Sequence, residues 1–355
     1  MTSHHATPHT ARRLRDLGIT IGELEPGARN AITDVPEVAV GHATLKADSV
    51  NTGVTAVLPH RGNLFRDKVM ATSVVFNGFG KTTGLVQVDE LGAIETPILL
   101  TNTLSVGTAA EALVRYKLRR NPEIGVTTGT VNPIVGECND GFLNDIRGLH
   151  VNSTHVDEAI LTAGPGVVQG AVGAGTGMSA YGLKGGIGSA SRRLEMKGQA
   201  HHLGILVLAN FGRLEDLIVA GRPIGRRIAE ARRATAVSDA GSIIILLGTD
   251  LPVSERQLRR IARRTAVGLA RTGSHLGHGS GDLCIAFTTA NRVVHDEPRA
   301  VIAWHALAET RIDLAFRAAA EATEEAVIDA MLAADPLIGR DGNRRDSLSD
   351  FLHLL

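Results

Sequence analysis

The stretch SDAGSIIILLGTD, residues 238–250, decides the fold, because it joins small turn-forming residues directly to a run of apolar β-formers. An uninterrupted apolar run such as Ile243–Leu247 is typical of a strand in the interior of a sheet. Gly241 and Ser242 open this run and allow two interpretations. They are ordinary turn residues, or the chain is cut between them and Ser242 becomes an N-terminal residue with a hydroxyl and its own amine base.

Other segments repeat this pattern of short apolar runs ended by Gly, Pro or Asn, which predicts further strands. Most of the runs are continuously apolar rather than alternating, so we expect sheets that are buried on both faces. The segments are ITDVPEVAVGHATL (32–45), TGVTAVLPH (52–60), KVMATSVVFNG (68–78), EIGVTTGTV (123–131), HLGILVLANFG (202–212) and DLCIAFTTAN (282–291).

Three segments between these runs predict helices. Residues 254–270 predict one helix, since Ser254 and Gln257 have the spacing of a capping box. Residues 105–120 and 305–334 have high helix propensity. Helices that cover the outer faces of sheets make a layered α/β domain. We expect a single domain over residues 13–355 after a flexible tail at residues 1–12.

The composition excludes several classes of protein. The 355 residues carry 37 basic and 37 acidic side chains, so nothing marks a nucleic-acid or anionic-membrane partner. The chain contains no apolar run of membrane-spanning length and does not begin with a secretory signal. Cys138 and Cys284 do not make a disulfide framework, which favours a reducing compartment and a cytoplasmic location.

Two glycine-containing motifs imitate nucleotide sites. Gly80, Lys81 and Thr82 match the end of a phosphate-binding loop, but Val75 stands where that loop needs its first glycine. The cluster at residues 170–192 begins a dinucleotide fingerprint and then departs from it at Met178. We therefore expect close backbone packing or a pocket-lining loop in the cluster, with its Lys184 on the surface.

Metal and hydrolase motifs are also missing. His275, His278 and Asp282 lie close together in SHLGHGSGD, but glycines break any helix there and no further ligand is recognisably spaced. The chain has no G-x-S-x-G elbow, which disfavours an α/β-hydrolase triad. We expect neither a metal nor a cofactor.

An N-terminal nucleophile at Ser242 would need neighbours of particular kinds. Its released amine, with an ordinary pKa of about 7.7–8.0, accepts the hydroxyl proton near neutral pH. Asn210, at the end of an expected strand, is a candidate oxyanion donor, and Ser280 with Asp282 is a candidate pair for tuning the amine. Each of these residues also has an ordinary explanation as a turn or loop residue.

Taken together, these segments resemble the L-aminopeptidase/D-esterase (DmpA-like) family, which includes the β-peptidyl aminopeptidases. The resemblance extends from about residue 15 to residue 335. It rests on eight ordered blocks: ITDVPEVAVGHATL, NTGVTAVLP, ELGAIETPILLTNTLSVGTA, NPIVGECNDGFLNDI, GLKGGIGSASR, GILVLANFG, AGSIIILLGTDLP and GSGDLCIAFTTAN.

The resemblance implies an α+β fold, a four-layer αββα sandwich of the DmpA/ornithine acetyltransferase type. It implies a precursor that cleaves itself between Gly241 and Ser242 into an α fragment, 1–241, and a β fragment, 242–355, which stay together. Family members commonly assemble as tetramers, so we expect a homo-oligomer.

The resemblance also assigns roles to residues of the site. Ser242 matches the nucleophile, Asn210 the oxyanion-hole asparagine, and Glu137 the acid that binds the free amine of the substrate. Ser280 and Asp282 match the polar pair near the nucleophile.

One position departs from the family. Relatives carry a catalytic tyrosine near the GECND segment, where this chain has Asn139 and Phe142. The only tyrosines are Tyr116 and Tyr181, so the second oxyanion donor is left open.

The expected activity is therefore the release of N-terminal residues from small peptides, amino-acid amides or esters through an acyl-Ser242 intermediate. The sequence leaves open whether the residues are L-, D- or β-amino acids. One alternative is an acyltransferase of the ornithine acetyltransferase type, against which the serine counts because those enzymes use threonine. Others are a nucleotide-binding protein that uses Gly80, Lys81 and Thr82, and an inert relative that binds ligands without cleavage.

Overall fold

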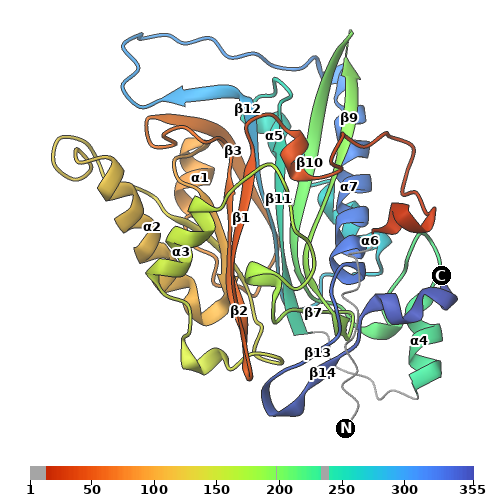
Figure 1. Ribbon diagram of the computed structural model, residues 1–355. Coiled ribbons are helices and arrows are strands. Elements are labelled where there is room, and N and C mark those ends of the chain that lie inside the picture. Colours follow the sequence, from red (N-terminus) through yellow and green to blue (C-terminus); the bar gives the residue numbers. More distant parts are fainter. Residues whose placement is uncertain (1–12, 197, 233–239) are drawn as a thin grey trace.

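The protein is described here by a computed structural model that covers residues 13–196, 198–232 and 240–355 (Figure 1). The flexible tail expected over residues 1–12 and the turn residues Ser238 and Asp239 lie outside these ranges. Within them, no helix combines the length and apolar character needed to cross a membrane.

Two large sheets form the centre of the described structure. The four-stranded sheet has the order β1 (Ala39–Ala47), β2 (Val50–Leu58), β5 (Ile98–Asn102), β6 (Ile134–Cys138). The six-stranded sheet has the order β4 (Ala93–Ile94), β3 (Asp67–Gly78), β12 (Gly279–Val294), β11 (Ala240–Thr249), β10 (Gln199–Asn210), β9 (Gly186–Met196). Two short hairpins add β7 (Ser179–Ala180) with β8 (Leu183–Lys184), and β13 (Leu337–Ile338) with β14 (Arg344–Arg345).

Strand β11 is buried on both faces, as its composition predicts. Ile244 and Leu246 pack into the core between the two sheets, together with residues such as Ile134 of β6. Ile243 and Ile245 point the other way, into the core beneath the helices. Because side chains alternate across a strand, a continuous apolar run serves both cores at once.

Helices lie on the outer faces of both sheets (Figure 1). Helices α2 (Val106–Arg120) and α3 (Ser153–Leu161) contact the four-stranded sheet. Helices α5 (Glu255–Ala262) and α7 (Asp313–Leu332) contact the six-stranded sheet, and α6 (Thr265–Arg271) packs on α7. Helix α1 (Leu85–Leu91) contacts β3 of the six-stranded sheet. Helix α4 (Ile224–Arg232) lies near the C-terminus. The mixed α/β character expected from the sequence is confirmed.

Helix α7 carries acidic side chains into the interior, where they are paired with arginines. Arg192 of β9 is fully buried, and its guanidinium donates to Glu321 at 3.2 Å and to Glu325 at 2.8 Å. Arg13 donates to the buried Asp329 at 3.0 Å. These pairs join the first described residues and the edge of the sheet to the helix.

Two expected segments differ from the structure. EIGVTTGTV (123–131) is not a strand, because the amides of residues 126–128 all turn back onto the carbonyl of Glu123, and Gly125 has a φ of +73°. The single helix expected over 254–270 is divided into α5 and α6. The capping box of Ser254 and Gln257 is present, but the Thr265 hydroxyl donates to the Ala262 carbonyl at 2.7 Å where the first helix ends.

The long C-terminal helix begins later than the sequence predicts, at Asp313 instead of residue 305. Two side chains hold the preceding segment away from a helical path. Asn291 donates to the carbonyl of His305 at 2.9 Å, and Gln257 donates to the carbonyl of Leu307 at 2.6 Å. These tertiary contacts use carbonyls that helical hydrogen bonds would otherwise need.

Candidate active site

Ser242 lies near the start of β11, in the middle of the six-stranded sheet. The antiparallel register with β10 places Asn210 opposite Ser242. The parallel register with β12 places Gly281 opposite Ser242, between Ser280 and Asp282. The sheet thus brings together four candidate residues that are up to 72 positions apart in the sequence.

The Ser242 hydroxyl lies against the peptide bond that precedes it. Its Oγ donates to the carbonyl oxygen of Gly241 at 2.6 Å and accepts the backbone N–H of Gly281 at 3.2 Å. Ser242 is only 4% exposed. Any Cβ added at Gly241 would lie 2.1 Å from the backbone oxygen of Asn210, so close approach to β10 requires glycine at this position.

Two backbone groups fix the side-chain amide of Asn210. Its Oδ1 accepts the N–H of Ser179 at 2.8 Å, and its Nδ2 donates to the carbonyl of Asn139 at 3.0 Å. The acceptor and donor contacts together determine which end of the amide is nitrogen. Nδ2 carries a second hydrogen, which leaves Asn210 able to donate to a ligand in the cavity that it lines.

Ser280 and Asp282 form a buried pair beside the nucleophile strand. The Ser280 hydroxyl donates to Oδ1 of Asp282 at 2.5 Å, and both residues are almost completely buried. Asn77 anchors the turn that leads into them by donating to the carbonyls of Gly277 and His278, each at 3.1 Å. Neither Ser280 nor Asp282 lines the cavity.

Glu137 lies on β6 of the other sheet and reaches the same cavity. Its Oε1 accepts the backbone N–H of Lys81 at 2.7 Å, and its Oε2 accepts the hydroxyl of Thr103. The carboxylate is 2% exposed. Each carboxylate oxygen can accept a further hydrogen bond, so Glu137 can also bind an ammonium group.

A cavity of about 540 Å³ contains these groups at its wall. Residues of both sheets and of the C-terminal segment line it. They are Phe79, Lys81, Thr103, Glu137, Asn139, Gly141, Phe142, Ile146, Arg147, Asn210, Gly241, Ser242, Gly279 and Arg340. A serine hydroxyl, a side-chain amide and a buried carboxylate therefore line one cavity. Such a set could cleave a substrate that carries a free amine.

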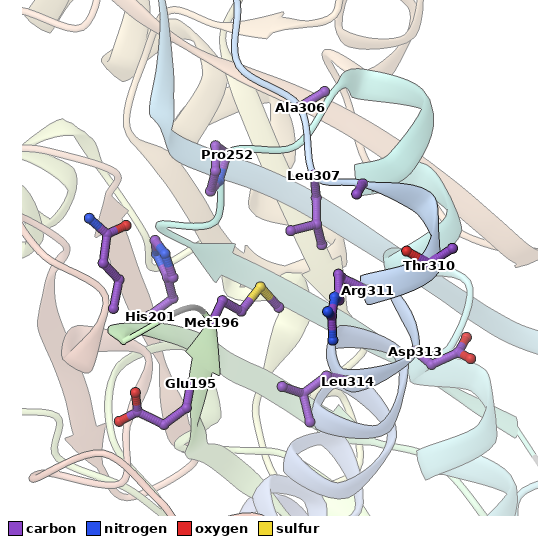
Figure 2. A pocket seen from close by; sticks show the side chains of 12 residues that line it. Glu195, Met196, His201, Pro252, Ala306, Leu307, Thr310, Arg311, Asp313 and Leu314 are labelled. Atoms are coloured by element: carbon purple, nitrogen blue, oxygen red, sulfur yellow. The ribbon is translucent and has the colours of Figure 1, made fainter.

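A larger cavity of about 730 Å³, shown in Figure 2, lies elsewhere. Its wall includes His201 of β10 and Pro252, which follows β11. His201 and Asn210 are nine positions apart on β10, and at about 3.3 Å per residue the two positions are about 30 Å apart. None of the candidate catalytic residues lines this larger cavity.

The segment that resembles the end of a phosphate-binding loop lies at the cavity of about 540 Å³ that Ser242 also lines. Phe79 and Lys81 line it, and Gly80 lies close to Glu137. A loop that wraps phosphates uses its backbone amides to bind an anion. Here the amide of Lys81 is already bonded to the Glu137 carboxylate, whose charge would repel a phosphate. The segment is a wall of the candidate active site.

The structure also shows the surroundings of other residues named in the sequence analysis. Lys184 is not on the surface: it is fully buried, and burial lowers the pKa of its ammonium to about 7. In the described part of the chain, no group of three or more potential metal-binding side chains was found around His275, His278 and Asp282 or elsewhere. Neither Tyr116 nor Tyr181 lines the cavity, and the Tyr181 hydroxyl is bonded to Thr272 at 2.8 Å.

Sequence reasoning missed the polar groups that hold the candidate side chains. Thr103 and the backbone amides of Lys81, Ser179 and Gly281 all bond directly to them. A backbone amide has no residue type that could mark it in a sequence. Thr103 lies within one of the blocks that carry the resemblance, but no spacing rule singles it out.

Comparison with known proteins places the chain among peptidases. The profile of Peptidase family S58 matches residues 30–345. The chain is 40% identical over 353 residues to the β-peptidyl aminopeptidase BapA of Sphingosinicella microcystinivorans, with 93% of this chain and 88% of that protein covered.

Two solved structures are similar over nearly their whole length. The PH0078 protein from Pyrococcus horikoshii OT3 has a TM-score of 0.92 and 52% identity, covering 97% of this chain and 98% of that one. The L-aminopeptidase D-Ala-esterase/amidase from Ochrobactrum anthropi has a TM-score of 0.88 and 35% identity, covering 95% of each chain. That enzyme is described as a prototype of the serine aminopeptidases and a variant of the Ntn hydrolase fold.

Proposed function

Because this chain belongs to peptidase family S58 and is a serine-type aminopeptidase, we propose that Ser242 is its nucleophile after the bond to Gly241 has been cleaved. One observation carries the proposal. The Ser242 hydroxyl lies 2.6 Å from the Gly241 carbonyl oxygen, in the same cavity as a buried carboxylate that can bind a substrate amine. The same Ser242 side chain would then serve first in maturation and afterwards in catalysis.

Maturation is an acyl shift followed by hydrolysis. Oγ of Ser242 attacks the carbonyl carbon of Gly241, the bond from that carbon to the Ser242 nitrogen breaks, and the hydroxyl proton moves to the departing nitrogen. Water then hydrolyses the resulting ester. The products are an α fragment of residues 1–241 and a β fragment of residues 242–355, held together by the central sheet, since β11 pairs with β10 of the α fragment.

The mature enzyme uses the freed amine of Ser242 as the general base. The amine takes the hydroxyl proton while Oγ attacks the substrate carbonyl, and Asn210 donates to the developing oxyanion. The amine leaving group departs with a proton, and water releases the acyl group from Ser242. The Ser280–Asp282 pair, on the neighbouring strand, provides the negative field that tunes the basicity of the amine.

Glu137 selects substrates with a free N-terminus. Its buried carboxylate binds the substrate ammonium by a charge-assisted hydrogen bond while Thr103 and the Lys81 amide keep its orientation. Small peptides, amino-acid amides and esters fit a cavity of about 540 Å³. The similarity to β-peptidyl aminopeptidases favours N-terminal β-residues among them.

Three finer features belong to the same proposal. The outer helices and the two facing sheets support a four-layer αββα sandwich. A homo-oligomer, expected to be a tetramer, is supported by a segment with Val301 and Trp304 exposed at 86% and 51%. A cytoplasmic location agrees with Cys138 and Cys284, which are both free thiols. Neither the acyltransferase nor the nucleotide-binding alternative is favoured.

A comparison of variants tests this function. Wild type, Ser242→Ala and the exposed control Ser49→Ala are each incubated with β-alanyl and L-alanyl p-nitroanilides, and released p-nitroaniline is measured. The wild type and the control should hydrolyse at least one substrate, and Ser242→Ala should hydrolyse neither. Hydrolysis by Ser242→Ala at more than about a hundredth of the wild-type rate would remove Ser242 from the mechanism.

A further inference from the structure

Three cationic side chains line the catalytic cavity and have no part in the chemistry described above. They belong to Lys81, Arg147 and Arg340. Among the described residues, Lys81 and Arg147 form no ion pair, and Arg340 has only the adjacent, exposed Asp341 at 3.5 Å. Glu137 is the one carboxylate among the lining residues, and two hydrogen bonds already engage it. The cavity therefore carries an excess of positive charge.

Contacts between distant segments join the two parts of the chain that carry the arginines. Arg147 lies in the short helix η4 (Ile146–Gly148), and Arg340 begins the short helix η8 (Arg340–Gly342). The Arg340 N–H donates to the carbonyl of Leu143 at 2.9 Å, and Asn343 donates to the carbonyl of Phe142 at 2.9 Å. The C-terminal segment is thus fastened to the loop that carries Arg147.

A cavity lined by these cations and by an ammonium-binding carboxylate suits a zwitterion. We propose that Arg147 and Arg340 bind the C-terminal carboxylate of the substrate, so that the enzyme prefers short peptides with a free carboxylate. The guanidinium group is always charged and presents paired N–H donors that match a carboxylate. This inference rests on the proposed function, because it places the leaving part of the substrate beside Ser242.

The test compares peptides that differ only in the C-terminal charge. Values of kcat/KM are measured for β-alanyl-leucine and β-alanyl-leucinamide, with the L-alanyl pair run in parallel. For the wild type, the free acid should exceed the amide by about 10-fold or more, the size expected for a hydrogen bond between charged groups. Arg147→Gln and Arg340→Gln should each reduce this ratio by about 3-fold or more, and the double variant should bring it close to one.

The amide serves as the internal control, since its kcat/KM should change less than about 2-fold in the arginine variants. Arg115→Gln, on the exposed face of α2, is the matched remote control. Equal kcat/KM for acid and amide in the wild type, or an unchanged ratio in the double variant, would overturn the carboxylate site alone. Failure of the wild type to cleave any of the peptides would instead overturn the proposed function.

A separate observation concerns Lys184, which the mechanism does not use. Its Nζ donates to the carbonyls of Gly175, Met178 and Gly185 at 3.1, 2.8 and 2.8 Å. The Met178 carbonyl and the Ser179 N–H belong to one peptide group, and that N–H donates to Oδ1 of Asn210. A continuous chain of hydrogen bonds therefore connects the buried ammonium to the candidate oxyanion donor.

We infer that Lys184 is a positioning residue that acts on Asn210 through the Met178–Ser179 peptide. A cation on the carbonyl polarises the peptide and strengthens its N–H as a donor, and the Asn210 amide that accepts this bond becomes a better donor in turn. The effect depends on the charge of Lys184, which the folded protein carries below a pKa of about 7, so the variants are compared at pH 6. It reaches the transition state, where the oxyanion forms.

Three substitutions of Lys184 distinguish the effect of its charge from the effect of its packing. Lys184→Met and Lys184→Gln should both lower kcat by about 5-fold or more with KM within about 2-fold, and Lys184→Arg, which keeps the charge, should recover most of the rate. A merely structural role predicts that Gln, which keeps hydrogen-bond donors, recovers activity as well as Arg does. That result, or a loss expressed mainly in KM, would overturn the inference. Circular dichroism establishes which variants are folded, and the comparison of Gln with Arg decides the question even where Met is not folded.

Discussion

At the scale of single residues, Gly241 is constrained by its neighbour strand. In the sequence, Gly241 can be interpreted as an ordinary turn residue, whereas the structure gives a steric reason for the glycine. Gly241 lies in β11 opposite Ser280 of β12, and the backbone oxygen of Asn210 occupies the space that a side chain would need. The proposed cleavage site is thus a place where two strands approach closely.

Gly241→Ala should slow self-cleavage by about 10-fold or more, because the added methyl group would push the scissile bond away from Ser242 and Asn210. Purified precursor is followed over time on a denaturing gel. Gly129→Ala is the control, because no atom lies within 4 Å of its added Cβ. Cleavage of Gly241→Ala at the wild-type rate would mean that the close approach has no role in maturation.

Glu137→Gln should raise KM by about 10- to 100-fold with a smaller effect on kcat. The amide keeps the shape of the side chain but loses the charge that attracts the substrate ammonium, and hydrogen bonds to charged groups contribute about 1.5–3 kcal/mol. Steady-state kinetics on an aminoacyl p-nitroanilide measure both constants, with the exposed Glu111→Gln as control. An unchanged KM would show that the ammonium binds elsewhere.

At the scale of secondary-structure elements, the sequence predicts strands better than it predicts their ends and pairings. The apolar run after Ser242 is sufficient to identify β11, because no surface strand has that composition. EIGVTTGTV fails because its β-branched residues surround a glycine with positive φ, which local composition does not reveal. The break between α5 and α6 depends on one threonine hydroxyl.

The candidate site was predictable only through its side chains. Resemblance to a family assigns Ser242, Asn210 and Glu137, but their proximity depends on strand register. Residues 210, 242 and 281 meet because β10, β11 and β12 are neighbours, and long-range pairing leaves no local trace in the sequence. The amides that orient Asn210 and Glu137 come from loops, which no pattern of side chains identifies.

The buried ion pairs between β9 and helix α7 should contribute to the stability of the protein. Arg192→Met should reduce the free energy of unfolding by about 3–5 kcal/mol, because it leaves Glu321 and Glu325 buried beside an apolar side chain. Urea unfolding followed by circular dichroism measures the difference, with Arg115→Met on α2 as control. A loss below about 1 kcal/mol would show that these carboxylates are compensated by other partners.

At the scale of the whole molecule, buried charge makes stability depend on pH. Burial lowers the pKa of Lys184 in the folded protein to about 7 from 10.5, with Lys46 lowering it further and Asp140 raising it. Between these values the unfolded chain binds a proton that the folded protein does not. Stability contributed by this group therefore rises with pH across that window.

Comparison of wild type with Lys184→Met isolates this effect. Urea midpoints measured from pH 6.5 to pH 10 should show the wild type gaining stability relative to the variant as the pH rises. Lys117, whose pKa burial also lowers, titrates in both proteins and cancels in the difference. A constant difference across this range would mean that Lys184 keeps its proton in the folded protein.

At the same scale, both fragments of the proposed mature enzyme contribute to one sheet and to one cavity. In the proposed maturation, β11 from Ser242 onward belongs to the second fragment, yet it pairs with β10 of the first, and the cavity takes residues from both sheets and from the C-terminal segment. Cutting the chain at residue 242 would leave this sheet intact, because the pairing continues from Ser242 to Thr249.

The most direct test is intact-mass spectrometry with N-terminal sequencing of the purified protein in its active form. Our account predicts two polypeptides in equal amounts, one ending at Gly241 and the other beginning SIIILLGTD. A fully active preparation that contains only the uncut chain of 355 residues would contradict it, because Ser242 would then have no free amine to act as a base.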